Sequence, residues 1–263
     1  MRFSSFWSPL RGVSAQGPTA GSEVKRPSIV VFDSLAWRYD DLFSRPRIGN
    51  QRRTVWEALA DIFQPGEAIL ALNCRTPEDG VFLALLDVSV VDLDATEGVI
   101  HTQLPRGAMF DGALSNFSGL NSVTDLSQTA HDLASLVTVG APVIVCLSSR
   151  FCFTETLWFL LHGKYRSAFR RFSGIATLKD SDRTVKLHYP GLREVKSLFS
   201  PSFFMRSCIG LGIAVPPSYL DPIMRKCPRV LSLLGLIDRC ICHLPFIRAI
   251  GDHILLYFER VEG

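Results

Sequence analysis

Short apolar runs alternate with helical periodicities from residue 32 to residue 147. Continuous aliphatic runs of four to eight residues are typical of buried strands, and apolar residues spaced three or four apart indicate helices. The predicted strands are 68–72, 88–91, 110–117 and 143–147, and the predicted helices are 32–43, 55–63, 78–86 and 126–137. This alternation with short loops predicts a doubly wound α/β sheet.

The pattern changes after residue 148. An apolar helix at 154–161 is followed by a basic helix, and residues 175–189 read as a hairpin that turns at Asp180-Ser181-Asp182. We expect residues of about 149–190 to form an α/β lid insertion over the carboxyl edge of the sheet. A helix at 192–199, a strand at 203–215, helical sequence near 231–237 and a last strand at 253–260 complete the prediction.

Composition sets the domain organisation. The chain has 263 residues, 47% hydrophobic and 20% charged, which fits one globular domain with a sizeable insertion. Residues 1–27 are rich in Ser, Gly and Pro and are predicted to be a disordered tail. The folded domain is therefore expected over residues 28–263.

Charge and hydropathy bear on partners. The net charge is only +3 and no long basic run is present, which argues against a nucleic-acid partner. The densest basic stretch, 164–172, fits either a phosphate contact or a solvated helix face. No apolar run reaches the ~18 residues of a membrane span, so we expect no transmembrane segment.

The seven cysteines include no Cys-x-x-Cys pair, and several lie in apolar runs. They are interpreted as reduced core residues of a cytoplasmic protein. The group of Cys240, Cys242 and His243 could suggest a metal site, but no second ligand cluster accompanies it. No metal is therefore predicted.

Several stretches together resemble a known family. They are "FDSLAWRYDDLF" at 32–43, the strand and loop of 68–79, the acidic end of the second strand, "FDGALSNFSGLNSV" at 110–123 and "GDHILLYFERV" at 251–261. In this order they resemble class I S-adenosylmethionine-dependent methyltransferases of the bacterial small-molecule type, over most of residues 29–260. The resemblance implies a Rossmann-like sheet with an antiparallel last strand, and S-adenosyl-L-methionine as cofactor.

The resemblance also implies which residues line the cofactor site. The loop 73–79 would pass under the methionine part of the cofactor, and a carboxylate after the second strand would accept two hydrogen bonds from the ribose diol. The residues carried over for cofactor binding are Tyr39, Asn73, Cys74, Asp79, Asp94, Asn116 and Phe117.

Two features depart from the family pattern. Arg75 and Pro77 stand in the loop where the family has glycines, which let the backbone approach the ligand. About fifteen residues separate Asp94 from Phe110, whereas two crossovers and a strand need roughly 25–30. The segment 98–105 could supply the strand, but at least one helix must be missing, so we expect a sheet shortened in its middle.

Three functional hypotheses remain open. The first is methyl transfer to a small, hydrophobic metabolite, with His162, His188 and Tyr189 as conceivable acceptor-side groups, although no spacing connects them and packing or surface roles are favoured for each. The second is a methyltransferase-fold protein that does not methylate, acting as a partner subunit or in a biosynthetic step without S-adenosylmethionine. The third is a peripheral membrane contact or a lipid substrate, from the apolar "TLWFLL" helix and its basic neighbour.

Overall fold

The computed structural model describes residues 50–74, 77–95, 100, 103–180, 183–217 and 227–262. The predicted tail at 1–27, the predicted helix at 32–43 with Tyr39, and Arg75 lie outside the described residues. The strands are β1 (Ala68–Leu72), β2 (Ser89–Leu93), β3 (Gly112–Ser115), β4 (Pro142–Ser148), β5 (Ile175–Asp180), β6 (Arg183–His188), β7 (Phe203–Leu211) and β8 (His253–Arg260). The α-helices are α2 (Asn50–Ile62), α3 (Pro77–Leu85), α4 (Leu126–Leu136), α5 (Phe153–Leu161), α6 (Tyr165–Ala168), α7 (Leu192–Phe199) and α9 (Pro228–Ile241), with short 3-10 turns η3 (Leu120–Ser122) and η5 (Ile247–Ala249).

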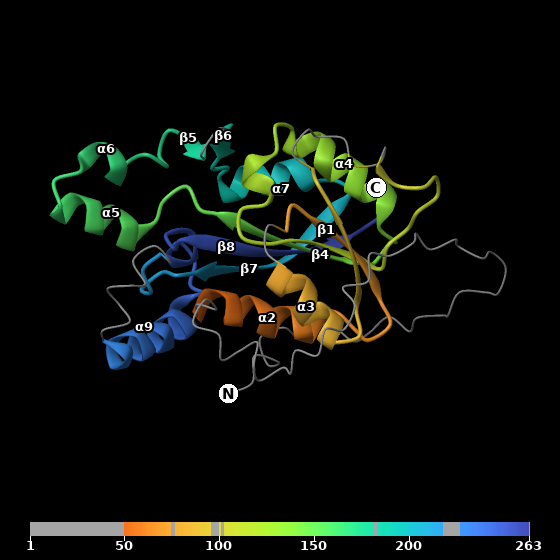
Figure 1. The fold of residues 1–263 in the computed structure, drawn as a ribbon, viewed down its shortest axis with the longest axis horizontal. Helices are drawn as coiled ribbons and strands as arrows, with labels where there is room; N and C mark the ends of the chain where they lie inside the picture. Colours follow the sequence, from red (N-terminus) through yellow and green to blue (C-terminus); the bar gives the residue numbers. More distant parts are fainter. Residues whose placement is uncertain are drawn as a thin grey trace.

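The main sheet has six strands in the order β2-β1-β3-β4-β8-β7. The four strands β1 to β4 are parallel, whereas β8 pairs antiparallel with both β4 and β7. The predicted doubly wound sheet with an antiparallel last strand is therefore confirmed (Figure 1).

Helices cover both faces of this sheet. Figure 1 shows α4 and α7 on one face and α2 and α3 on the other. The first face packs Leu133 of α4 and Phe199 of α7 into a core with Phe258, whose ring is stacked on Phe199 at 4.6 Å. The second face buries Trp56 of α2 against Phe82 of α3, with parallel rings also 4.6 Å apart. Burial of these aromatic side chains holds the helices against the two faces of the sheet.

The middle of the sheet is short, as expected. Between Leu93 and Gly112 no described residue belongs to a strand, so the strand suggested at 98–105 is not observed at Ile100 or at 103–105. Ile100 is instead buried, and its N–H donates to Asp132 Oδ2 at 3.1 Å. As a result β2 is the edge strand of the described sheet.

Two predicted strands were too long. The strand predicted at 110–117 spans only Gly112–Ser115, because Phe110 forms an isolated bridge with Val137. The strand predicted at 203–215 ends at Leu211, because Gly212 follows with φ +63°. This positive φ favours glycine, and a Cβ there would also displace the Gln51 amide.

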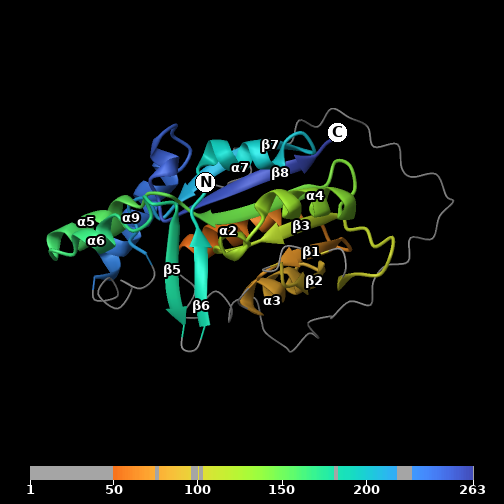
Figure 2. The ribbon, with the colours of Figure 1, turned by 90° about the horizontal axis from the view of Figure 1, so that it is seen from above.

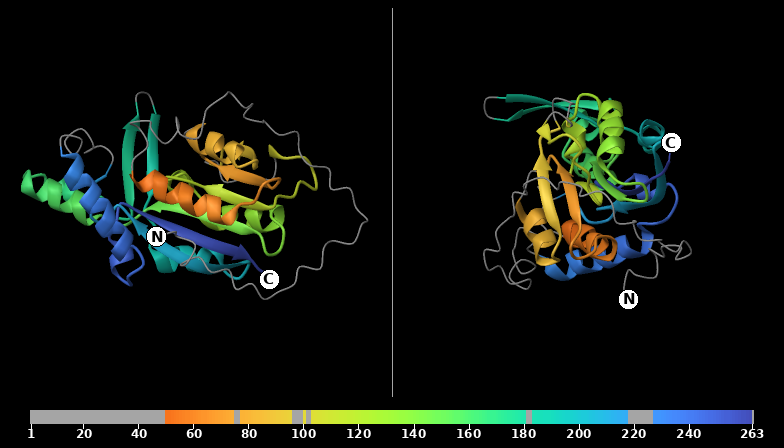
Figure 3. Two further views of the ribbon diagram at one scale, coloured as in Figure 1. Left: turned by 90° about the horizontal axis from the view of Figure 1, so that it is seen from below. Right: turned by 90° about the vertical axis from the view of Figure 1, so that its right-hand side faces the viewer.

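The lid insertion contains α5, α6 and the β5–β6 hairpin, which forms its own two-stranded sheet. Figure 2 shows this hairpin crossing the direction of the main strands. Figure 3 shows α5 and α9 at the same end of the molecule. Among the described residues no helix is long and apolar enough to cross a membrane.

Candidate functional site

Six strand ends meet at one edge of the sheet, including the end of β7 at Leu211, which pairs with His253. The parallel strands β1, β2, β3 and β4 end there, at Leu72, Leu93, Ser115 and Ser148. Because β8 is antiparallel, it begins at this edge, and its first residue His253 is the register partner of Ser148. Ligands of open α/β sheets bind at the carboxyl edge, so we built the candidate site from this edge.

Asn73 joins three of these strand ends. Its backbone is left-handed, with φ +52°, a conformation that Asn tolerates better than most residues other than glycine. Its side-chain Oδ1 accepts a hydrogen bond from Ala95 N at 2.7 Å, and its Nδ2 donates to Gly119 O at 3.1 Å. Asn73 therefore adopts a backbone conformation that glycine adopts most easily, and its side chain forms hydrogen bonds to the segments that follow β2 and β3.

Asp79 is the buried centre of a second polar group. Its carboxylate accepts hydrogen bonds from Trp56 Nε1 at 2.7 Å and from Asn116 Nδ2 at 3.0 Å. Arg52 Nε lies 3.7 Å from the same carboxylate. Burial raises the pKa of Asp79, and the Arg52 charge and the two hydrogen bonds oppose that rise. The structure thus brings the predicted residues Asp79 and Asn116 together.

The ends of β1 and β2 also lie side by side. Asn73 N donates to Leu93 O at 2.9 Å, and Cys74 N donates to Asp92 Oδ1 at 3.4 Å. Burial raises the pKa of the Cys74 thiol to about 12, which makes it a poor nucleophile. Asp94 is exposed just beyond β2, and its backbone O accepts from Gln103 Nε2 at 2.7 Å.

Phe117 and Ser118 form a strained turn after β3. Both have left-handed backbones, with φ of +41° and +69°. The Phe117 ring lies 5.0 Å below the Arg52 guanidinium and makes an edge contact with the His253 ring at 5.4 Å. Non-glycine residues persist in such conformations only where the surrounding structure holds them, and they cluster at functional sites.

A buried ion-pair group attaches the lid insertion to β8. The Arg171 guanidinium donates to Glu155, and its Nη2 lies 2.8 Å from Asp252 Oδ1. Burial alone would raise the pKa of Asp252, but His253 and Arg171 hold that pKa well below its usual range. Cys152, Glu155 and Asp252 have the spacing of metal ligands, yet Glu155 is paired with both Arg170 and Arg171, and Asp252 is paired with Arg171. The group is accounted for by these ion pairs.

The three acceptor-side candidates are dispersed. His162 is exposed at the end of α5, with its ring 4.1 Å from Trp158. His188 accepts a hydrogen bond through its backbone O from Asn121 Nδ2, and Tyr189 is buried with Arg171 5.6 Å from its ring. His162 shares no described contact with the other two, so their acceptor role stays a prediction.

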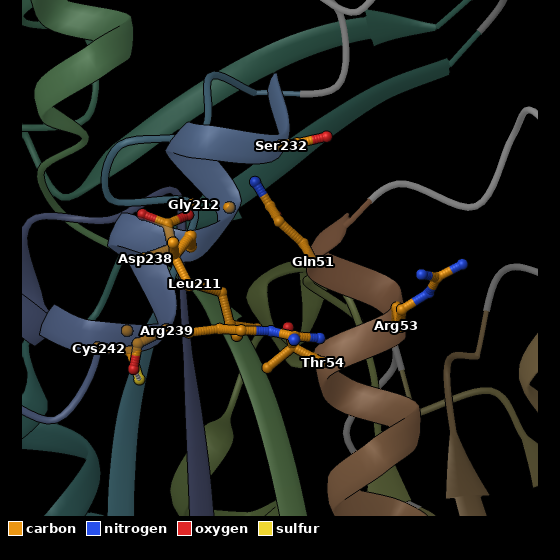
Figure 4. Close-up of a pocket in the computed structure, with 12 residues that line it drawn as sticks. Gln51, Arg53, Thr54, Leu211, Gly212, Ser232, Asp238, Arg239 and Cys242 are labelled. Carbon is orange, nitrogen blue, oxygen red and sulfur yellow. Dashed lines mark hydrogen bonds between the residues drawn. The ribbon is translucent and has the colours of Figure 1, made fainter. Parts of the chain in front are cut away.

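A pocket of about 320 Å³ opens beside the edge, between α2, the end of β7 and α9 (Figure 4). In Figure 4 the Gln51 side chain points towards Gly212. Asp238 lines the opposite wall and accepts from Ala214 N at 2.5 Å. Cys242 is buried and lines this pocket, whereas Cys240 is exposed. Of the residues expected to bind the cofactor, none of the six that the structure describes lines this pocket.

Sequence reasoning missed Ser118, Arg171, Asp252 and His253. A signal for His253 was present, because an antiparallel last strand must begin at the carboxyl edge of its parallel neighbours. Arg171 had no such signal, since it meets Asp252 only through the fold of the lid insertion.

No protein-family model matches the chain, and no curated protein matches it. Solved structures, in contrast, do match the chain. A putative S-adenosylmethionine-dependent methyltransferase from Listeria monocytogenes is 11% identical, with a TM-score of 0.50 over 81% of this chain and 99% of that one. This likeness shows that the chain has the Rossmann-like class I methyltransferase fold.

Two further solved structures are similar at lower scores. A methyltransferase from Mesorhizobium loti has 11% identity and a TM-score of 0.44, covering 83% of this chain and all of the other (100%). Geranyl diphosphate C-methyltransferase from Streptomyces coelicolor has 11% identity and a TM-score of 0.47, covering 90% and 92%.

Proposed function

We propose that this protein binds S-adenosylmethionine at the carboxyl edge of the sheet and methylates a small, hydrophobic molecule. The observation that supports this most is the methyltransferase fold, with a polar edge built from the ends of β1, β2 and β3. The acidic end of β2 lies directly beside the loop after β1 in this edge.

The described residues fit the ribose end of the cofactor. Asp94 presents an exposed carboxylate, a group that can accept two hydrogen bonds from a vicinal diol. The bonds of Asn73 to Leu93 and Ala95 hold the loop after β1 against the Asp94 segment. The cofactor supplies an activated methyl group, so the protein must chiefly position the acceptor and exclude water.

A second candidate is a methyltransferase-fold protein that no longer methylates and serves as a partner subunit or in a step without S-adenosylmethionine. One observation favours it. Both polar atoms of the Asn73 side chain are bonded within the protein, Oδ1 to Ala95 N and Nδ2 to Gly119 O, so this side chain connects three strand ends whether or not a ligand is bound.

Calorimetric titration with S-adenosylhomocysteine separates the two candidates. The first predicts saturable binding, and the second predicts none. The second also predicts that the double change Arg75→Gly and Pro77→Gly leaves biological activity unchanged or lower. A measured methyl transfer without any copurifying partner would contradict the second candidate.

We also propose that the end of the molecule formed by α5, α6 and α9 contacts an anionic lipid surface. Such a contact would suit a protein that takes an apolar acceptor. Leu161 is 75% exposed and Leu233 is 58% exposed. Residues 149–174 and 227–250 contain eight Lys and Arg but only two acids, Glu155 and Asp238. Both acids accept hydrogen bonds from the protein itself, which leaves a basic and apolar surface.

A cytoplasmic location is also proposed. All seven cysteines are free, and four of them, Cys146, Cys152, Cys208 and Cys242, are buried. Unpaired cysteines in a core are typical of proteins kept in a reducing compartment, which supports this location. Comparison of the thiol count of the purified protein before and after reduction tests it.

A further inference from the structure

Two hydroxyls and one imidazole meet at the carboxyl edge. Ser118 comes from the strained turn after β3, Ser148 is the last residue of β4, and His253 is the first residue of β8. Ser118 Oγ lies 2.5 Å from Ser148 Oγ and 3.3 Å from His253 Nε2. Three separate strands are needed to assemble this group.

The tautomer of His253 follows from its partners. Its Nδ1 lies 3.2 Å from Asp252 Oδ2 and 3.2 Å from Gln51 Oε1, and both of these oxygens accept hydrogen bonds. The Gln51 amide is oriented by its own Nε2, which donates to Asp252 Oδ2 at 3.5 Å. Nδ1 therefore carries the proton, and the lone pair of Nε2 faces the Ser118 hydroxyl.

The charges around the ring suit a base that becomes cationic. Asp252 is buried next to His253 on β8, and Arg171 from the lid insertion fixes its other oxygen at 2.8 Å. Arg52 of α2 lies on the Phe117 ring, which separates it from the imidazole. A carboxylate that holds Nδ1–H stabilises the imidazolium formed when Nε2 accepts a proton.

The turn that carries Ser118 is held rigidly. Ser118 N donates to Cys146 O at 3.0 Å, and a Cβ at the following Gly119 would lie only 2.9 Å from Leu72 O. These contacts fix the backbone of the turn, whereas the Ser118 side chain can rotate about χ1 and leave Nε2 to the hydroxyl of a bound acceptor.

We propose that His253 is the general base of the methyl acceptor, that Asp252 and Gln51 are its positioning residues, and that the acceptor is an apolar molecule with a phenol or alcohol hydroxyl. The acceptor hydroxyl replaces Ser118 at Nε2. Its O–H bond breaks, the proton goes to Nε2, and the electron pair stays on the acceptor oxygen. This inference rests on the proposed methyl transfer and adds the acceptor class to it.

The first test is independent of turnover. Nitrogen-15 NMR of the histidine rings is recorded for the full chain, alone and with 4-heptylphenol or 1-dodecanol as probes. The expected spectrum shows His253 protonated on Nδ1, with an Nε2 resonance that moves on addition of either probe. Protonation on Nε2, or an Nε2 resonance that neither probe moves, would overturn the proposal.

Variants separate positioning from folding. Asp252→Asn is expected to shift the His253 proton towards Nε2, but it also removes a partner of Arg171. Gln51→Ala gives a second test without touching that ion pair, and it is expected to broaden or shift the Nδ1 resonance. An unchanged His253 ring in a folded Gln51→Ala protein would contradict the positioning role.

The second test is kinetic, with 4-heptylphenol as acceptor. His253→Gln is expected to lower kcat by about a hundredfold or more, with binding of S-adenosylhomocysteine within about twofold of wild type. His131→Gln, at an exposed position of α4, is the matched control.

A fully active His253→Gln enzyme would overturn the assignment of His253 as the base. Absent cofactor binding with an intact NMR response would overturn only the proposed methyl transfer. Covalent capture of Ser118 by a fluorophosphonate would also overturn the assignment of His253 as the base of a methyl acceptor, because Ser118 would then be a nucleophile.

Discussion

The Asp79 carboxylate and the Asn116 amide, 37 residues apart, are hydrogen-bonded at 3.0 Å. This bond ties the start of α3 to the end of β3, and Trp56 Nε1 occupies the other carboxylate oxygen at 2.7 Å. Two helices and one strand are thereby fixed around a single buried acid at the candidate site.

Removal of this carboxylate should destabilise the fold. In Asp79→Ala, the Trp56 and Asn116 donors lose their acceptor inside the protein, and Arg52 loses an ion-pair partner. We expect the free energy of unfolding to fall by about 2–4 kcal/mol, measured by urea denaturation. Asp61→Ala, at an exposed position of the neighbouring α2, should change it by less than about 0.5 kcal/mol. Equal effects of the two changes would contradict the role of Asp79.

Asp94 should act on the ligand and not on stability. Asp94→Ala removes an exposed carboxylate, so we expect an unchanged unfolding midpoint. Loss of charged hydrogen bonds to a ribose diol should weaken the binding of S-adenosylhomocysteine by about ten- to a hundredfold, measured by calorimetry. Asp61→Ala is again the control, and equal affinity of Asp94→Ala and wild type would exclude this carboxylate from the site.

Arg171 should hold the lid insertion to β8. Arg171→Met removes the cation that joins Glu155 and Asp252, and the buried Asp252 carboxylate then keeps only its contacts with His253 and the Gln51 amide. We expect a loss of about 3 kcal/mol in the free energy of unfolding near pH 7. Arg166→Met, an exposed change in α6, serves as the control and should be nearly neutral.

The ion pair between Arg171 and Asp252 makes the free energy of unfolding depend on pH. The pKa of Asp252 is lowered in the folded protein, so its contribution is complete above the unfolded value of about 3.9 and is lost as pH falls below it. The difference in stability between wild type and Arg171→Met should therefore be constant from about pH 7 to pH 5 and shrink in more acidic buffer. A difference that grows with falling pH would show that the ion pair is not its source.

The lipid contact is tested by flotation with vesicles. Leu161→Asp places a negative charge on the exposed apolar surface of α5 and should abolish flotation of the protein with vesicles rich in phosphatidylglycerol. Val139→Asp, 59% exposed before the opposite end of β4, is the matched control and should bind as wild type does. Wild-type protein that binds no anionic vesicle, or that self-associates through this end instead, would contradict the contact.

Local patterns predicted most of the fold because the central strands β1, β3 and β4 are almost entirely buried and therefore appear as continuous apolar runs. The runs at 68–72 and 253–260 coincide with β1 and β8, and 192–199 coincides with α7. The end of β7 was missed because it depends on the positive φ of Gly212, and a glycine inside an apolar run does not reveal its backbone conformation from sequence alone.

The candidate site was harder to predict because its bonds join distant segments. Asp79 and Asn116 were both expected at the edge, but no local pattern indicated that Asp79 bonds to both Asn116 and Trp56. Asn73 was expected as a ligand contact, whereas its side chain bridges Ala95 and Gly119. Such long-range pairs follow from the packing of the strands and not from local periodicity.

The most direct test of the central proposal is calorimetric titration of the wild-type chain with S-adenosylhomocysteine, followed by competition with S-adenosylmethionine. The account predicts saturable binding at one site, displaced by S-adenosylmethionine and weakened in Asp94→Ala. A folded protein that gives no heat of binding with millimolar ligand at two temperatures would contradict it.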